Sequence, residues 1–174
     1  MMYGNDQGAP RLLSADIRAK AAWVYGAVNR KTVLKTLLTD GTLAMILYRL
    51  MQGCQRLAWK LPAMVFNKLN VVLCRCVIGR NAAFGPGFVL IHSNGVVINS
   101  QVRGGRDIRI EHEVTIGEEK GKSPVLGDDV FVGAGAKIFG DVKVGSHTKI
   151  GANAVVVDDV PEGATVVGVP GRPV

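Results

Sequence analysis

The second half of this 174-residue chain repeats with a period of six, and this repeat constrains the fold more than any other feature. A large apolar residue occupies thirteen of the fourteen positions met in steps of six. The fourteen positions are Ile78, Phe84, Leu90, Val96, Val102, Ile108, Val114, Lys120, Leu126, Val132, Ile138, Val144, Ile150 and Val156. Gly often follows the repeat residue directly, as at Gly79 and Gly127, and a small or aliphatic residue follows the later repeats after four places.

This pattern has a physical cause in a triangular β-helix. Each coil of such a prism has three flat sheets and takes three hexads, or about eighteen residues, and successive coils stack at the strand spacing of ~4.8 Å. The large aliphatic residue points into a narrow dry core, and Gly serves the turns, where φ is often positive. The repeat therefore predicts a mainly β fold, a parallel β-helix of hexapeptide repeats with about four and a half coils.

The repeat is interrupted once, at Lys120. This position falls in the charged, Gly-rich stretch GEEKGKS (Gly117–Ser123), and the register resumes at Leu126. We expect a loop that protrudes from the prism. Such loops commonly carry function, and the alternative is a tolerated insertion.

The residues before the repeat have the period of helices. We expect a short α-helical N-terminal region over residues 1–72 and the β-helix domain over 73–174. Apolar residues recur at helical spacing in 12–31, where Ser14 is the expected N-cap, then in 43–60, with a break before Pro62, and in 63–78. None of these stretches has the ~20 continuous apolar residues that span a bilayer.

Charge divides the chain into a basic and a slightly acidic part. Residues 1–80 hold twelve Lys/Arg against three Asp/Glu, and residues 81–174 hold nine against eleven. The basic part could face nucleic acid, an anionic polymer or an anionic membrane surface, or it is a solvated helix face. Because no stacking aromatic residues alternate with the cations and no known nucleic-acid motif is present, we expect no nucleic-acid partner.

The cysteines and the polar first residues of the chain indicate the cellular location that we expect for the protein. The three cysteines, Cys54, Cys74 and Cys76, are odd in number and lie in apolar surroundings, which favours buried reduced thiols. No zinc-like spacing is present, so no metal is expected. The start of the chain lacks the apolar core of a cleavable signal. We expect a cytoplasmic protein, with peripheral contact at the inner membrane surface through the basic helices as a further expectation.

Several segments resemble a known family. FVLIHSNGVVI (Phe88–Ile98), IEHEVTIG (Ile110–Gly117) and VGAGAKIFGDVKVGSHTKIGANAVV (Val132–Val156) are similar to the serine acetyltransferases, a family of left-handed β-helix acyltransferases. The resemblance covers about residues 75–174, with a faint echo in DGTLAMILYRL (Asp40–Leu50). It implies a left-handed β-helix, a homotrimer with active sites between prisms, and acetyl-CoA as co-substrate.

A narrower resemblance is to the subgroup that acetylates polysaccharides, including the colanic-acid acetyltransferases. Its INxxV and HxVTIG segments are matched by Ile98-Asn99…Val102 and by His112–Gly117. Serine acetyltransferases usually carry a longer helical N-terminal region than the roughly 70 residues found before the first coil.

The resemblance assigns the role of general base to His92. A neutral imidazole suits proton removal from a hydroxyl near pH 7, and the attack on the thioester would be direct. The alternative is an ordinary surface histidine. The family's two acids near this histidine are replaced by Val77 and Ile91, and its second substrate histidine by Ser123, which weakens the case for L-serine as acceptor.

We expect His112 to compensate for these replacements. It follows His92 by twenty residues, close to one coil, so the two could stack on one edge or meet across a subunit boundary. Glu111 or Glu113 could orient an imidazole. The alternative is that His112 only caps a turn. His147 is expected at a solvated turn position.

The remaining site residues are carried over from the family. They comprise a substrate-binding set and a coenzyme A set, the latter in a groove between neighbouring prisms. The substrate-binding residues are Asn94, Glu113 and Ser123, and the coenzyme A residues are Gly117, Ala134, Lys149, Ala152 and Arg172. Lys and Arg would meet the phosphates, while Gly and Ala are also explained by the repeat alone.

Together these observations predict an acetyl-CoA-dependent O-acetyltransferase that acts on a sugar hydroxyl of a surface polysaccharide or its precursor. The first alternative is a serine O-acetyltransferase of cysteine biosynthesis. The second is a β-helix without catalytic activity that serves as a structural or binding module.

Overall fold

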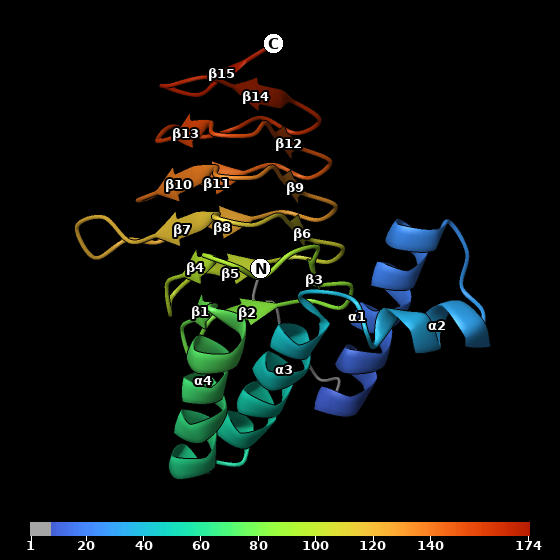
Figure 1. Cartoon of the computed structure of the whole chain (residues 1–174). Helices are drawn as coiled ribbons and strands as arrows, with labels where there is room; N and C mark the ends of the chain where they lie inside the picture. Colours follow the sequence, from blue (N-terminus) through green and yellow to red (C-terminus); the bar gives the residue numbers. More distant parts are fainter. Residues whose placement is uncertain (1–7) are drawn as a thin grey trace.

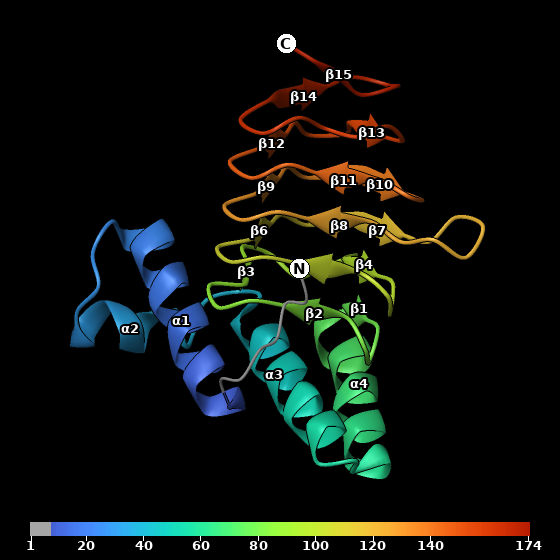
Figure 2. The same cartoon turned by 180° about the vertical axis from the view of Figure 1, so that it is seen from behind.

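The computed structural model describes residues 8–174, with four helices that lie below and beside the lower coils of a three-sided parallel β-helix (Figures 1 and 2). The prediction of a mainly β fold with a short helical N-terminal region is therefore confirmed. The expectation that the chain lacks a cleavable signal rests largely on residues 1–7, which lie outside the described residues. Over residues 8–174, no helix is both long and apolar enough to span a bilayer.

Fifteen short strands form the three faces of the prism. The first face has the order β1-β4-β7-β10-β13, the second β2-β5-β8-β11, and the third β3-β6-β9-β12-β14-β15, in which only the last pairing is antiparallel. Their bounds are β1 Val77–Ile78, β2 Ala83–Phe84, β3 Val89–Leu90, β4 Val97–Ile98, β5 Arg103–Gly104, β6 Arg109–Ile110, β7 Thr115–Gly117, β8 Val125–Leu126, β9 Phe131–Val132, β10 Lys137–Phe139, β11 Lys143–Val144, β12 Lys149–Ile150, β13 Val155–Val156, β14 Thr165–Val167 and β15 Arg172–Pro173.

The strand register contains two irregular turns where the sequence suggested one. In the regular coils Leu126 pairs with Val144, eighteen residues on, but Ile78 pairs with Ile98, twenty residues on. The two extra residues lie in the turn between Leu90 and Ile98, which contains His92. Four more lie in the loop between β7 and β8, which stands out sideways from the prism (Figure 1).

The prediction of a single interruption at Lys120 is therefore wrong, for a physical reason. A turn residue two places before the inward strand residue also points into the core, as Val96 does before Ile98, and both are buried. After the first insertion, the residues met in steps of six are therefore still apolar, but they occupy turn positions instead of strand positions. The four-residue insertion restores the original phase at Leu126.

The helices run from α1 (Ala9–Tyr25) and α2 (Arg30–Thr36) to the hairpin of α3 (Thr42–Arg56) and α4 (Lys60–Cys74). The N-cap of α1 is Gly8, with Pro10 in the first turn, so Ser14 lies inside the helix and its prediction as N-cap is wrong. The break in the second apolar stretch falls at Leu57–Trp59, and Pro62 occupies the first turn of α4, where a missing N–H costs nothing.

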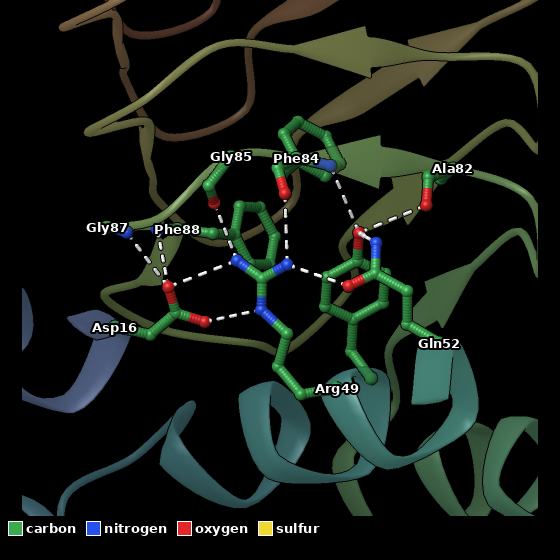
Figure 3. Close-up of polar contacts among 9 residues, drawn as sticks. Asp16, Arg49, Gln52, Ala82, Phe84, Gly85, Gly87 and Phe88 are labelled. Atoms are coloured by element: carbon green, nitrogen blue, oxygen red, sulfur yellow. Dashed lines mark hydrogen bonds and ion pairs between the residues drawn. The ribbon is translucent and has the colours of Figure 1, made fainter. Parts of the chain in front are cut away.

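A buried ion pair fastens these helices to the first coil (Figure 3). Arg49 on α3 donates from Nε to Asp16 Oδ2 on α1 over 2.6 Å, and its other nitrogens reach the carbonyl oxygens of Phe84 and Gly85. Asp16 Oδ1 in turn accepts the backbone N–H groups of Gly87 and Phe88. Since both side chains are almost fully buried, α1, α3 and the β2–β3 turn are held in one arrangement.

Aromatic packing closes the lower end of the prism. Phe84 and Phe88 stack with ring centroids 4.4 Å apart, and Tyr48 on α3 lies 5.2 Å from the Phe88 ring. Gly104 on β5 makes room for Phe84, because a Cβ there would approach the ring to 2.3 Å. The core of the β-helix is thus continuous with the packing of α3.

The cysteine prediction holds only in part. Cys76 is buried, and burial raises the pKa of its thiol to about 12, while Cys54 and Cys74 are half-buried. All three are free thiols.

Candidate functional site

One edge of the prism, where the third face turns into the first, carries most of the predicted site residues. Backbone hydrogen bonds stack Asn94, His112, Ala134 and Ala152 in a column on successive coils, with Glu113 bonded to Asn94, Gly135 to His112 and Asn153 to Ala134. We call this column, together with His92, the histidine edge. His92 lies at its lower end, in the turn that has two extra residues.

His92 is paired with a carboxylate from the helical region. Its Nδ1 lies 2.9 Å from Asp40 Oδ2, and both side chains are about half exposed. Because Nδ1 is engaged with a carboxylate, the neutral ring carries its proton on Nδ1 and leaves the Nε2 lone pair available. This is the arrangement in which an imidazole acts as a general base.

Asp40 is itself held in place by two contacts besides the one with His92. Its Oδ1 accepts the Gly41 N–H over 2.7 Å, and the buried ammonium of Lys20 on α1 donates to the carbonyl oxygens of Asp40 and Leu90, the latter over 2.7 Å. Gly41 has a φ of +74°, and a Cβ there would lie 2.4 Å from the Leu90 carbonyl oxygen. The turn before α3 is thus pressed onto the strand that leads to His92.

These contacts determine the charge of Asp40. Partial burial raises the pKa of Asp40, but the hydrogen bond with His92, the Gly41 N–H and the positive charge of Lys20 outweigh it and hold the pKa below its usual value. Asp40 is therefore ionised wherever His92 would act as a base. Burial lowers the pKa of Lys20 to about 8, against the opposing effect of the Asp40 charge.

His112 lies beside His92 on the same chain. The two rings are 5.9 Å apart, edge to face, and Glu111 Oε2 lies 3.6 Å from His112 Nδ1. Glu113 occupies the adjoining turn with a φ of +58°, and its carbonyl oxygen accepts from Lys137 Nζ. The structure thus places Glu111, rather than Glu113, next to an imidazole.

Ser123 and Gly117 lie on a different edge of the same prism. Ser123 Oγ contacts Asn99 Oδ1 over 3.1 Å, where the loop after β7 rejoins the coil. Gly117 packs under Phe139, whose ring atoms would lie 2.5 Å from a Cβ at this position. The packing of Phe139 therefore explains why residue 117 is a glycine. Within one chain, neither Ser123 nor Gly117 meets His92.

The other coenzyme A candidates are spread along the upper coils. Ala134 and Ala152 belong to the histidine edge, Lys149 is exposed on β12, and Arg172 on β15 forms an ion pair with Asp158 over 3.1 Å. His147 lies on the opposite edge of the third face. Its Nδ1 is 2.9 Å from Asp129 Oδ2, a hydrogen bond that raises the pKa of this exposed histidine.

A cleft opens beside the His92–Asp40 pair. It has a volume of about 360 Å³ between the turn before α3, the end of α4 and the first coil. Its polar lining residues are Thr39, Asp40, Arg75, Ser93 and Asn94. Within residues 8–174, His, Cys, Asp and Glu side chains form no group of three that could hold a metal ion.

Sequence reasoning missed Asp40 and Lys20. Asp40 lies 52 residues before His92, and no local spacing relates them. A signal was nevertheless present, because Asp40 opens the helical segment DGTLAMILYRL that resembles the family outside the coils.

Comparison with known proteins gives consistent matches. Residues 123–158 match the family described as bacterial transferase hexapeptide (six repeats). The serine acetyltransferase of Helicobacter pylori is 40% identical over 146 residues, which cover 82% of this chain and 84% of that protein. The Mycobacterium tuberculosis serine acetyltransferase is 42% identical over 117 residues, or 65% of this chain and 51% of that one.

Solved structures agree with these relatives. The Neisseria gonorrhoeae serine acetyltransferase superposes with a TM-score of 0.86 at 32% identity, covering 95% of this chain and 66% of that one. A serine acetyltransferase in complex with CoA superposes with a TM-score of 0.86 at 31% identity, covering 99% and 72%. The fold, the histidine edge and these matches agree, and the chain belongs to the serine acetyltransferase family of hexapeptide-repeat acyltransferases.

Proposed function

We propose that this acetyltransferase moves the acetyl group of acetyl-CoA to the hydroxyl of L-serine, with His92 as general base. The observation that carries the proposal is the pairing of His92 Nδ1 with Asp40, which leaves Nε2 directed away from the carboxylate. The relatives that match across most of this chain are named serine acetyltransferases. They favour L-serine over the sugar acceptor expected from the sequence.

The reaction requires one proton to move twice. His92 Nε2 takes the proton of the acceptor hydroxyl as its oxygen attacks the thioester carbonyl, so that the C–O bond forms and the C–S bond breaks. The protonated imidazole, stabilised by the ionised Asp40, then returns the proton to the departing thiolate. His112, on the neighbouring coil, is the side chain we assign to hold the acceptor hydroxyl or the carbonyl oxygen in place.

The histidine edge also suits the donor. Ala134 and Ala152 lie above His112 in the same column, and their small side chains leave the backbone open to an extended pantetheine arm. Lys149 is exposed on β12, at the same height as Ala152, and suits the phosphates of coenzyme A. The complex of a similar serine acetyltransferase with CoA supports acetyl-CoA as co-substrate.

The proposal includes a homotrimer. The loop at Gly117–Ser123 and the histidine edge lie on different edges of one prism. In a closed ring of three prisms, each loop would reach the histidine edge of a neighbour. Ser123 and the rest of that loop would then complete the acceptor site.

Purified protein supplied with acetyl-CoA and L-serine tests the proposal by the release of free thiol. We expect turnover with L-serine and its loss by at least about 100-fold in His92→Gln, which removes the base. Turnover with nucleotide sugars or oligosaccharides and none with L-serine would contradict the proposed acceptor and leave the acetyl transfer intact.

A sugar hydroxyl remains the second candidate because of one specific observation. The positions at which the family carries ionisable groups hold Val77, Ile91 and Ser123 here. A free amino acid brings two charges that need partners, whereas a neutral sugar needs only hydrogen bonds. The same assay with the two acceptor classes distinguishes the candidates.

A further inference from the structure

The cleft beside the His92–Asp40 pair contains one cation, Arg75. Among the described residues that line this cleft, Asp40 and Arg75 carry the charges, and the others are neutral. Arg75 follows directly after α4, and its side chain is exposed in the single chain. A cleft with one charge of each sign suits an acceptor that carries a charge of its own.

Backbone hydrogen bonds place Arg75 directly below the histidine edge. The Gly95 N–H donates to the Arg75 carbonyl oxygen over 3.0 Å, and the same bond recurs one coil higher between Glu113 and Asn94. Arg75 therefore continues the column of the histidine edge by one coil, below Asn94. Since Asn94 follows His92 by two residues, the Arg75 side chain starts from a backbone position next to the base.

The backbone conformation of Arg75 is uncommon for a residue other than glycine. Arg75 ends α4 with a φ of +48° and a ψ of 37°, in the left-handed region, and its N–H donates to the Asn70 carbonyl oxygen. Glycine is the usual residue at such a helix end, so an arginine here is explained by its side chain. One such explanation is the favourable interaction of a cation with the helix dipole, which the experiment must separate from ligand binding.

The neighbouring lysines on this edge already have partners, whereas Arg75 has none. Lys20 donates to two carbonyl oxygens, and Lys137 Nζ donates to the carbonyl oxygen of Glu113. Within residues 8–174, the Arg75 side chain forms no hydrogen bond and no ion pair. Its guanidinium is therefore available to a ligand in the cleft.

The proposed ring of three prisms would bring the loop of a neighbouring chain to this edge and enclose the cleft. The lysines of that loop, Lys120 and Lys122, form ion pairs with carboxylates of their own chain. Glu118 in the same loop accepts the Gly121 N–H over 2.8 Å. Since these charged side chains are already engaged, the enclosed site would still contain Arg75 as its unpaired cation.

We propose that Arg75 binds the carboxylate of the acceptor. A guanidinium meets a carboxylate through two parallel hydrogen bonds, which neutralise the charge and fix the orientation of the ligand. L-serine held in this way keeps its hydroxyl free to approach His92. Arg75 would also compensate for Ser123, which stands where the family has its second substrate histidine. The inference rests on the proposed function, because it names how the same site selects its acceptor.

Steady-state kinetics with two acceptors test this inference. L-serinamide keeps the hydroxyl and the amino group of L-serine but has no carboxylate, so the unmodified chain should prefer L-serine. We expect Arg75→Met to raise the KM for L-serine about 10- to 100-fold, because a hydrogen-bonded ion pair is lost. The KM values for L-serinamide and for acetyl-CoA should stay within about twofold. Arg75→Lys keeps the charge without the two parallel bonds and should recover part of the loss.

Arg80→Met is the matched control for loss of a cation from the first coil. Arg80 is also exposed, but it lines a different cleft, together with residues of α3. This variant should leave the KM values for both acceptors and for acetyl-CoA unchanged.

Three results would overturn the inference while the proposed function stands. The first is an unchanged KM for L-serine in Arg75→Met, and the second is an equal rise in Arg80→Met, which would mean that only net charge matters. The third is an equal rise for L-serine and L-serinamide in Arg75→Met, which would assign Arg75 to the end of α4 alone. No turnover of L-serine by the unmodified chain would instead overturn the proposed acceptor, and this role of Arg75 with it.

Discussion

The proposed role of His92 as a base requires that its ring be held in one orientation and one tautomer, and Asp40 is the side chain that contacts its Nδ1. The carboxylate is held by the Gly41 N–H, and its backbone is fixed by Lys20, which also binds the Leu90 carbonyl oxygen two residues before His92. Lys20 thus links the base and its carboxylate without touching either side chain. It is a positioning residue, which acts through the backbone.

A double-mutant cycle tests this chain of contacts. Asp40→Asn should lower kcat at least tenfold, about 1.4 kcal/mol of barrier, because the amide no longer stabilises the protonated imidazole. Lys20→Met should also lower kcat, but should add little in the Asp40→Asn background, because both changes disrupt the same pair. The measurement is kcat and KM for all four proteins.

Lys31→Met is the control for loss of a cation from the same region, since Lys31 is exposed on α2. It should leave kcat unchanged. Fully additive losses for Lys20→Met and Asp40→Asn would mean that Lys20 supports only the fold.

At the scale of elements, the helical region is useful to the site only because it is fixed to the first coil. The Asp16–Arg49 pair forms hydrogen bonds with four backbone groups, at Phe84 in β2 and at Gly85, Gly87 and Phe88 in the turn that follows. Breaking a buried pair leaves an uncompensated charge in the core.

We therefore expect Arg49→Met and Asp16→Asn each to lower the free energy of unfolding by about 3–5 kcal/mol. Their double variant should lose much less than the sum, because each single change already breaks the shared network. Urea unfolding followed by circular dichroism measures these values. Lys122→Gln, which breaks the exposed pair with Asp141, should unfold like the unmodified chain, and an equal loss there would contradict the assignment.

At the scale of the whole molecule, the two irregular turns lie on different edges of the prism. One carries His92, and the other is the loop at Gly117–Ser123, so a single chain does not bring them together. The proposed trimer joins them across a subunit boundary.

Mixing two inactive variants tests this arrangement. His92→Gln and a variant that lacks residues 118–122 should each be inactive alone. Unfolded and refolded together, they should regain part of the activity, because some interfaces then combine an intact His92 with an intact loop. No recovery in mixed trimers of confirmed composition would place each complete site within one chain.

The six-residue repeat is enough to specify a β-helix, because its inward-facing positions recur at a fixed spacing along the chain. The spacing of twenty residues from His92 to His112, close to one coil, also allows these two to lie on a common edge, whereas Ala134 and Ala152 are expected only from the resemblance. The repeat could not separate the two insertions, because strand and turn positions both point inward and both hold aliphatic residues.

Which side chain lies next to His92 follows only from how distant parts of the chain pack together. Asp40 comes from a turn whose position depends on α1 and α3 packing on the first coil, and on two buried cations, Lys20 and Arg49, that bind backbone oxygens far away in the chain. Contacts of this kind leave no periodic trace in the sequence. The repeat therefore specifies the scaffold, and the packing of the helices on the first coil orients His92.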